Sequence, residues 1–553
     1  MKAAELLVRS LEKEGVQYIF GLPGEENMAV LDALIGSTIQ FIPVRHEQGG
    51  AFMADVYGRL TGKAGVCMST LGPGATNLMT GVADANLDSA PLVAITGQVS
   101  TKTMHKESHQ YLDLVSMFRP VTKWNTQIAQ RDTVGEVVRK AFKLAESEKP
   151  GATHIDLPED IADLPVREGH EIPLNPQSFC DAEAADVCIR HAAKLISQAR
   201  NPMILAGNGV IRAKATAALI HFAETLNIPV TNTFMGKGAI PYTHPLSLWT
   251  VGLQARDYIA FGFDQSDLII AVGYDLIEYG PTKWNPEHNS QVIHVSMTPS
   301  EVDRDYMPEV EVVGAIATSL ERIISYANRS EHAAPAALNL RPLLWEDYTA
   351  EANDTSFPLK PQKVIYDLRQ VLRSQDILIS DVGAHKMWIA RHYHAIEPNT
   401  CLISNGFAAM GIALPGAIAA KLVYPERKVV AVTGDGGFMM NMQELETAVR
   451  VGTAFVVLIF NDGGYGLIEW KQEVQYGRSA FVKFGNPDFV ALAEAMGVKG
   501  YRINSAAELV PTLKRALAQE VPVVIDCPVD YRENAKLTKK LGELSVATLG
   551  GNV

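Results

Sequence analysis

The sequence predicts an α/β protein of three doubly wound domains, each a parallel sheet covered by helices on both faces. Short apolar, β-branched runs alternate along the chain with segments of helical spacing, which is typical of parallel strands joined by helices. Several runs end in small-residue turns, such as GLPGEEN at 21–27, LGPGATN at 71–77 and GDGG at 434–437. The 553 residues are also enough for about three domains of ordinary size.

The domain boundaries follow from changes in pattern along the chain. The first domain is expected at 1–170 and the second at 183–330. Residues 331–360 are interpreted as a linker, because HAAPAALNLRP within this segment is rich in Ala and Pro and lacks periodicity. The third domain is expected at 361–553.

Within the domains, helical spacing and apolar runs place individual elements. The predicted helices are 3–14, which ends at Gly15, 28–34 and 49–60, with another over 465–478. The predicted strands are 16–20, 39–44, 65–70, 91–96, 153–158, 202–206, 229–232, 268–272, 291–295, 376–379, 429–433 and 455–460.

Composition and charge favour a cytoplasmic enzyme over a nucleic-acid-binding or membrane protein. The formal net charge of −13 would repel a phosphate backbone. No apolar run approaches the ~18–20 residues of a membrane span, and MKAAELLVRSLEKEGV at the amino terminus is an amphipathic helix rather than a signal peptide. The five cysteines show no metal-ligand or disulfide spacing, which favours thiols in a reducing compartment.

The stretch 428–470 carries the strongest chemical signal. Two short buried strands each end in a small-residue turn with a carboxylate, Asp435 in GDGG and Asp462 in NDGG. If the strands are neighbours, both carboxylates lie at the carboxyl-terminal edge of the sheet, where α/β folds bind ligands. Hard oxygen ligands beside glycine backbone suit Mg²⁺ holding a diphosphate. The alternative is two ordinary turns with solvated aspartates.

GDG followed, after 24 residues, by Asn461-Asp462 resembles the cofactor motif of thiamine diphosphate enzymes. The resemblance implies that Asp435, Asp462 and the backbone carbonyl of Gly464 bind Mg²⁺. It also implies that the surrounding residues line the cofactor and the substrate pocket. These residues are Gly434, Gly436, Gly437, Asn461, Tyr465, Gly466, Leu467 and Ile468.

A second match to this family is VRHEQGGAFMADVYGRLTG at 44–62, which contains Glu47. By itself Glu47 is a helix amino-terminal glutamate, which the helix dipole favours. The resemblance implies a catalytic role: the carboxyl hydrogen-bonds the cofactor pyrimidine ring and shuttles a proton.

The same resemblance assigns roles to residues that otherwise fit ordinary turns, core or surface positions. Gly72, Pro73 and Asn77 of LGPGATN would line the pyrimidine, and Gln110 would be a catalytic hydrogen-bond donor near the acceptor ketone. The remaining implied cofactor contacts are Gly383, Ala384 and His385 at the diphosphate, the Ala408 carbonyl at the amino group, and Met410 beneath the two rings.

Within the family the chain is most similar to acetolactate synthases of the catabolic, flavin-independent type. FGNPD at 484–488, VDY at 529–531 and GYDLIEY at 273–279 carry this likeness. The Gly-Met-His-Gly segment of flavin-dependent members is missing from 244–257, so FAD is not expected, although Gly207 to Gly209 and Arg212 leave flavin open. The sequence departs from the pattern of this family at two places, GEEN at 24–27 and Lys471. The resemblance implies that both places border the acceptor substrate, so the identity of that substrate stays open.

The resemblance implies an acetolactate synthase with thiamine diphosphate and Mg²⁺. Such an enzyme decarboxylates pyruvate and ligates the hydroxyethyl carbanion to a second pyruvate, giving 2-acetolactate and CO₂. A homodimer or homotetramer is implied, with the cofactor between subunits. A 2-oxo acid decarboxylase is the first alternative, disfavoured because no His-His pair occurs in the first domain. A non-catalytic nucleotide-binding protein is the other; it would have no need of Glu47.

Overall fold

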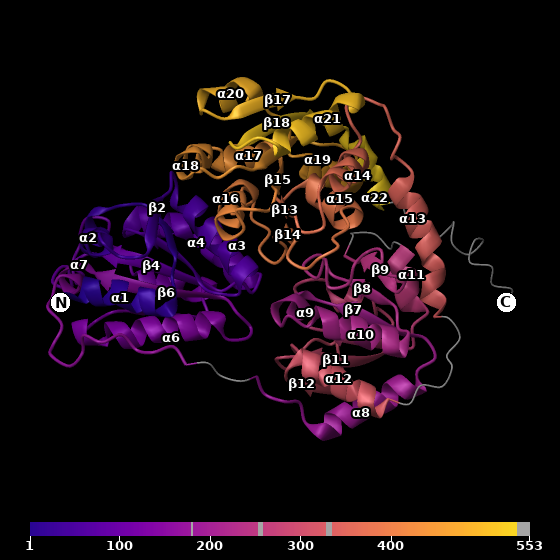
Figure 1. The fold of residues 1–553 in the computed structure, drawn as a ribbon, viewed down its shortest axis with the longest axis horizontal. Helices are drawn as coiled ribbons and strands as arrows, with labels where there is room; N and C mark the ends of the chain where they lie inside the picture. The colour runs from indigo at the N-terminus through magenta and orange to yellow at the C-terminus, as the bar shows by residue number, and fades with distance from the viewer. Residues whose placement is uncertain (178–180, 253–257, 328–334, 539–553) are drawn as a thin grey trace.

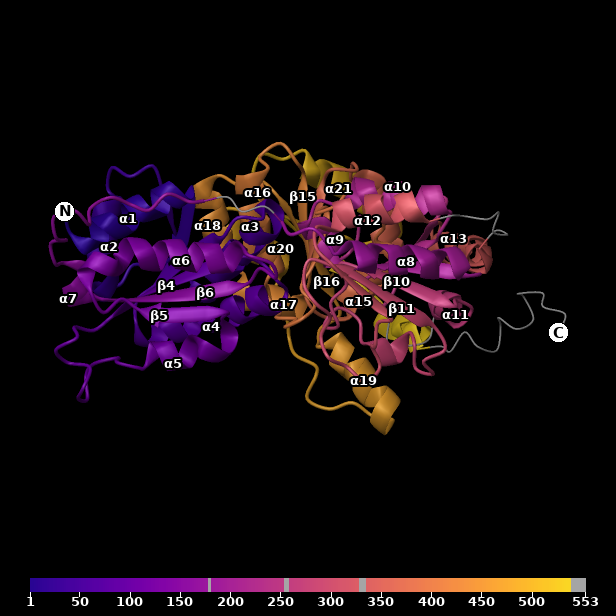
Figure 2. The same ribbon diagram turned by 90° about the horizontal axis from the view of Figure 1, so that it is seen from below.

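The computed structural model describes residues 1–177, 181–252, 258–327 and 335–538. It contains three six-stranded sheets in which every strand pairing is parallel, with helices on the sheet faces (Figures 1 and 2). The predicted fold class is therefore confirmed. None of the helices formed by these residues is long and apolar enough to cross a bilayer.

The first sheet has the strand order β2-β1-β3-β4-β6-β5. Helix α1 ends at Gly15 as predicted, because this glycine adopts the left-handed conformation (φ +85°) that terminates a helix. The strands are β1 (Tyr18–Gly21), β2 (Gln40–Pro43), β3 (Gly65–Ser69), β4 (Leu92–Gln98), β5 (Trp124–Gln127) and β6 (Ala152–Pro158). The helices are α1 (Ala3–Glu14), α2 (Met28–Leu34), α3 (Glu47–Thr61), α4 (Gly72–Leu87), α5 (Leu114–Phe118), α6 (Val134–Glu146) and α7 (Glu159–Ala162).

The second sheet has the order β12-β11-β10-β7-β8-β9. If β7 to β12 are numbered 1 to 6, the order starting from β9 is 3-2-1-4-5-6. This is the strand order of dinucleotide-binding folds. The strands are β7 (Pro202–Ala206), β8 (Val230–Asn232), β9 (Ser247–Thr250), β10 (Leu268–Val272), β11 (Gln291–Ser296) and β12 (Val310–Val313). The helices are α8 (Asp186–Gln198), α9 (Asn208–Arg212), α10 (Thr216–Leu226), α11 (Tyr258–Asp264) and α12 (Ile316–Tyr326).

The segment interpreted as a linker, 331–360, is helical over much of its described part. It forms a 3₁₀ turn, Ala336–Leu340, followed by α13 (Arg341–Thr349). Leu344 and Tyr348 are buried against the second domain, where Tyr348 packs on Trp249 with ring centroids 5.9 Å apart. The connection between the second and third domains is thus packed onto the second domain rather than extended.

The third sheet has the order β14-β13-β15-β16-β18-β17, which repeats the order of the first sheet strand for strand. Its strands are β13 (Ile377–Ser380), β14 (Cys401–Ile403), β15 (Val429–Gly434), β16 (Val456–Asn461), β17 (Lys499–Arg502) and β18 (Val523–Pro528). Its helices are α14 (Pro361–Val371), α15 (Ala384–His392), α16 (Ala413–Val423), α17 (Asp435–Asn441), α18 (Glu444–Val451), α19 (Gly466–Tyr476), α20 (Phe489–Ala495), α21 (Ala506–Leu517) and α22 (Ala535–Thr538).

The first and third domains pack through the equivalent helices α3 and α16, which lie side by side in Figure 1. Small residues allow close approach: a Cβ added to Gly416 would lie 2.8 Å from the Val56 side chain. Apolar residues of both domains, including Phe52 and Phe438, form one continuous core. This shared burial fixes the two domains relative to each other.

A buried ion cluster reinforces the same interface. Arg59 on α3 donates to Asp55, Asp84 and Asp88 at 2.7–3.0 Å, and the three aspartate side chains are fully buried. Asp84 also accepts from the Ser404 hydroxyl and the Ala409 N–H of the third domain, while Asp88 accepts from the Asn405 and Gly406 N–H groups. Carboxylates of the first domain therefore shape the 404–409 loop of the third.

Replacing Arg59 by Met should destabilise the protein by about 3–5 kcal/mol, since three buried carboxylates would lose their cation. Lys63→Ala is the matched control: its pair with Glu146 has a lysine side chain that is 68% exposed and should cost under about 1 kcal/mol. Thermal and urea unfolding of both variants measure the difference. Equal unfolding midpoints for the two variants would contradict this account of the interface.

Candidate active site

The carboxyl ends of the third sheet bring together the two aspartates of the strongest sequence motif. Asp435 follows β15 and Asp462 follows β16, and these two strands pair in register from Val430 with Val456 to Gly434 with Phe460. Burial, and next the nearby Asp435 carboxylate, raise the pKa of Asp462 to about 7. The two carboxylates are therefore neighbours at the carboxyl-terminal edge of the sheet, as predicted.

Asp435 is held rigidly at the start of α17. Its carboxylate accepts from the backbone N–H groups of Gly436 and Gly463, both at 2.7 Å, and from the Asn486 side-chain amide at 2.8 Å. The side chain is almost fully buried. Three donors on one buried carboxylate fix its orientation and compensate its negative charge.

Several buried polar atoms around these aspartates have no partner among the described residues, although buried polar groups are normally hydrogen-bonded. Burial lowers the pKa of His385 to about 3, so its imidazole is neutral near pH 7. Next to Asp462, a hollow of about 340 Å³ lies between α19 and the segment after β18. The unpartnered atoms are His385 Nε2, Asp462 Oδ2, Trp470 Nε1, Asn486 Oδ1 and Tyr531 Oη.

These features fit a cation and a phosphorylated ligand. A Cβ on Gly436 would lie 2.8 Å from the Tyr465 ring, and one on Gly466 would lie 2.6 Å from Asp462 Oδ2, so a larger residue at either position would displace a side chain of the site. The metal ligands implied by the sequence are two carboxylates and the Gly464 carbonyl. This set contains only two acidic side chains. The described residues contain no group of three or more His, Cys, Asp or Glu residues suited to a metal.

The other predicted cofactor contacts of the third domain stand around the same sheet edge. Gly383 precedes α15, and Ala408 (φ +58°) and Met410 lie in the loop between β14 and α16. The remaining positions are Ala384 and His385 in α15, Gly434 at the end of β15, Gly437 in α17, Asn461 at the end of β16, Gly464 and Tyr465 in the next turn, and Leu467 and Ile468 in α19.

Asp381 supports this loop and was not singled out from the sequence, although it lies two residues before the predicted contact Gly383. Its buried carboxylate accepts from the N–H groups of Val382, Gly411 and Ala413 at 2.8–3.1 Å. Burial raises the pKa of Asp381 to about 6. The position of Met410, next to Gly411, therefore depends on a carboxylate from the adjacent strand.

Glu47 is the first residue of α3 and is buried, as its proposed role requires. One carboxylate oxygen accepts from the Asn77 side-chain amide at 2.9 Å, so two predicted site residues meet directly. The turn before Glu47 is held by Glu444 of the third domain, which accepts from the Arg45 and His46 N–H groups at 3.0 Å each. Burial raises the pKa of Glu444 to about 6.

Gln110 lies at the turn that opens α4. Gly72 adopts φ +48°, and a Cβ there would lie 2.8 Å from the Gln110 carbonyl oxygen, so the two residues are in contact. Gln110 itself is exposed with φ +57°, and Pro73 is also exposed. The structure thus brings Gln110, Gly72 and Pro73 to one turn, with Asn77 and Glu47 beside them.

The predicted residues form two groups on different domains. Glu47, Gly72, Asn77 and Gln110 belong to the first domain, and the residues around Asp435 belong to the third. No hydrogen bond between described residues joins the two groups within the chain.

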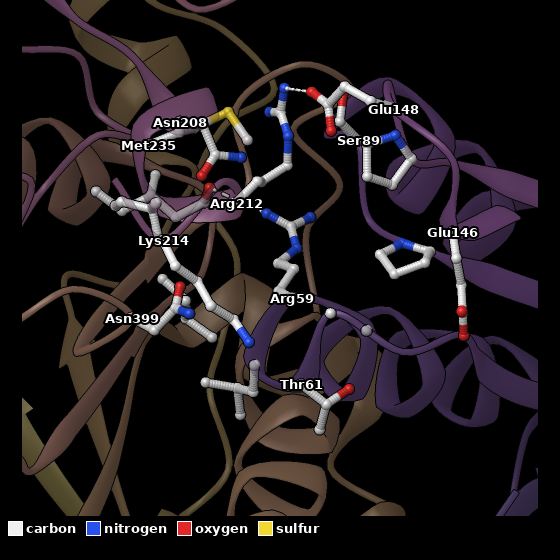
Figure 3. Close-up of a pocket in the computed structure, with 18 of the residues that line it drawn as sticks. Arg59, Thr61, Ser89, Glu146, Glu148, Asn208, Arg212, Lys214, Met235 and Asn399 are labelled. Carbon is white, nitrogen blue, oxygen red and sulfur yellow. Dashed lines mark hydrogen bonds and ion pairs between the residues drawn. The ribbon is translucent and has the colours of Figure 1, made fainter. Parts of the chain in front are cut away.

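A separate cavity of about 180 Å³ lies where the three domains meet (Figure 3). None of the residues predicted for the thiamine diphosphate site lines it, whereas Asn208 and Arg212, two of the residues that leave flavin open, do. Its two arginines are already paired: Arg59 with the aspartate cluster, and Arg212 with Glu148 at 2.6 Å and Asp275 at 3.3 Å. This cavity is therefore distinct from the candidate active site.

Comparison with known proteins agrees with the geometry of the site. The chain matches three domains of thiamine pyrophosphate enzymes, where thiamine pyrophosphate (TPP) is another name for thiamine diphosphate. They are the N-terminal TPP binding domain over 1–117, the central domain over 189–323 and the C-terminal TPP binding domain over 381–527.

Its relatives are similar over nearly the whole chain. The catabolic acetolactate synthase of Raoultella terrigena is 38% identical, with 97% of each chain covered. A probable acetolactate synthase large subunit of Methanocaldococcus jannaschii is 37% identical, covering 99% of this chain and 95% of the relative. The acetolactate synthase of Bacillus subtilis is 34% identical, covering 98% and 96%. The chain therefore belongs to the acetolactate synthase family of thiamine diphosphate-dependent enzymes.

Proposed function

We propose that this protein is an acetolactate synthase that converts two molecules of pyruvate into 2-acetolactate and CO₂, with thiamine diphosphate and Mg²⁺ as cofactors. One observation carries the proposal: a buried Glu47 and the paired Asp435 and Asp462 occur together in a chain that is similar to acetolactate synthases over its full length. Incubating the purified protein with thiamine diphosphate, Mg²⁺ and pyruvate, and identifying the products by mass, tests it.

The residues would divide the work by domain. Thiamine diphosphate, when bound, supplies a carbon nucleophile and an electron sink. Asp435, Asp462 and the Gly464 carbonyl would hold Mg²⁺ and through it the diphosphate, as hard oxygen ligands do. Glu47, oriented by Asn77, would hold and return a proton at its carboxyl oxygen.

Ligation rather than simple decarboxylation is favoured by the first domain. The decarboxylase alternative needs an acid that protonates the carbanion, and residues 1–170 contain no His-His pair for that step. Gln110, in contact with Gly72 at the same turn as the Glu47 partner Asn77, is a neutral donor suited to a second ketone. Acetaldehyde as the main product would favour the decarboxylase.

Glu47→Gln should lower the rate of acetolactate formation about 10²–10⁴-fold. The amide keeps the shape of the side chain but cannot give or take the proton. The matched control is Glu168→Gln, a change at an exposed glutamate of the same domain. Acetolactate formed per minute measures the effect, and calorimetry shows whether the cofactor still binds. Near-normal turnover by the Glu47→Gln enzyme would remove Glu47 from the mechanism.

A homodimer is proposed because the two groups of site residues lie on different domains and no hydrogen bond between described residues joins them within one chain. Apolar side chains near the third-domain group are open to solvent, and α19 extends away from the sheets (Figure 2). A second copy that placed its first domain here would bury this surface and bring its Glu47 to Asp435. The exposed side chains are Phe407 (44%), Met439 (38%), Met440 (41%), Tyr465 (39%) and Ile468 (47%).

Co-expressing Glu47→Gln and Asp435→Asn chains should restore activity that neither variant has alone. If each site combines Glu47 of one chain with Asp435 of the other, a mixed dimer has one intact and one doubly altered site. Random pairing then predicts about one quarter of wild-type activity. Mixed dimers isolated with two affinity tags should account for all of it. Mixed dimers without activity would show that each site is built from a single chain.

Flavin independence is proposed from the second domain. Dinucleotides bind such a sheet at its switch point, here between β7 and β10, with the diphosphate at the turn after the first strand. In this protein the buried Glu278 carboxylate accepts from the Asn208 N–H at 3.1 Å and from the Thr233 hydroxyl. A Cβ on Gly209 would lie 2.7 Å from Gly273, so the two turns are in contact.

The protein should purify without flavin absorbance, and added FAD should leave the rate of acetolactate formation unchanged. The physical reason is that Glu278 fills the position a diphosphate would need. Visible absorbance of the purified protein and assays with and without FAD check this. Stoichiometric flavin on the purified protein, or a rate that depends on FAD, would contradict it.

A further inference from the structure

The segment 482–488 lies outside the sequence motif of the proposed metal site but runs along its second turn. The Tyr465 N–H donates to the Val482 carbonyl at 2.9 Å, and the Phe484 N–H donates to the Gly463 carbonyl at 3.3 Å. Lys483 pairs with Glu469 at 2.7 Å. These contacts form an antiparallel bridge between the segment and the turn that carries Asp462.

The far end of this segment is fixed as well. Asp488 caps α20 by accepting from the Val490 and Ala491 N–H groups at 3.0 and 3.2 Å. The rings of Tyr465 and Phe484 pack edge to face with centroids 5.0 Å apart. A residue between Phe484 and Asp488 is therefore held in place from both sides.

Asn486 is that residue, and its amide joins the two halves of the motif. Its Nδ2 donates to Asp435 Oδ2 at 2.8 Å and to Asn461 Oδ1 at 3.0 Å. Asp435 follows β15 and Asn461 ends β16, so one side chain connects the ends of two neighbouring strands.

The direction of the Asn486 amide follows from the row of hydrogen bonds to which it belongs. Asn461 Nδ2 donates to the Asp526 carboxylate at 2.8 Å, which leaves Asn461 Oδ1 as an acceptor facing Asn486. Asn486 must therefore turn its Nδ2 toward Asn461 and Asp435. Its Oδ1 is then a buried acceptor with no partner among the described residues.

We propose that Asn486 is a positioning residue of the metal site: it holds Asp435 in the orientation that binds the cation, and its Oδ1, unpartnered among the described residues, would accept from a water bound at the site. The proposal rests on the proposed function, which requires Mg²⁺ at Asp435 and Asp462. Hydrogen bonds to ligating carboxylates commonly set metal affinity in this way.

Asn486→Leu should raise the Kd for Mg²⁺ about 10–100-fold at saturating thiamine diphosphate, because Asp435 loses one of its three donors. Asn486→Ser keeps one hydroxyl donor and should give an intermediate Kd. Asn504→Leu, at an exposed asparagine of the same domain, is the matched control. Mg²⁺ titrations followed by calorimetry and tryptophan fluorescence, and melting temperatures in EDTA, are the readouts.

The outcomes separate this proposal from the proposed function. If the wild-type protein binds no thiamine diphosphate in the presence of Mg²⁺, the proposed function fails first. If the wild type binds and both Asn486 variants share its Kd for Mg²⁺, Asn486 has no positioning role. A lower melting temperature in EDTA with an unchanged Kd would make the residue merely structural and also overturn the proposal. If the Leu variant does not fold, the Ser variant decides.

Discussion

The rest of the structure depends on one constraint: buried carboxylates of the first and third domains accept hydrogen bonds from backbone N–H groups of the other domain. Asp84 and Asp88 of the first domain, both paired with Arg59, accept hydrogen bonds from N–H groups of the 404–409 loop, which contains Ala408 and precedes Met410. In the other direction, Glu444 of the third domain holds the turn that carries Glu47. Each domain thus shapes a functional turn of the other, and the α3–α16 core keeps the two in register.

Much of the fold could be predicted because parallel strands buried on both faces are short apolar runs in the sequence. Strands β7 and β10 coincide with the predicted ranges. Strands that the sequence analysis does not name are mostly edge strands: β17, Lys499–Arg502, has no fully buried residue, whereas β9 and β14 are buried but only four and three residues long. β18 is the exception, a buried interior strand that was missed. Helix α13 was obscured by the Ala- and Pro-rich residues before it.

The site was predictable where a motif is contiguous in the chain. Asp435, Asp462 and Glu47 each stand in a recognisable turn. Asp381, Glu444 and Asn486 act through contacts between distant parts of the sequence, such as that of Arg45 with Glu444 at a separation of 399 positions, and no local pattern reveals such contacts. In the sequence, FGNPD at 484–488 shows only a likeness to acetolactate synthases. The hydrogen bonds of Asn486 emerge once β15 and β16 are side by side.

Glu278 has a consequence for how this protein depends on its surroundings. A bound ligand stabilises a fold only to the extent that its free concentration exceeds its dissociation constant. A carboxylate on the same chain has an effective concentration set by the fold, which dilution does not lower. The Glu278 carboxylate therefore accepts from the Asn208 N–H of the turn after β7 from within the same chain, at any dilution of the protein.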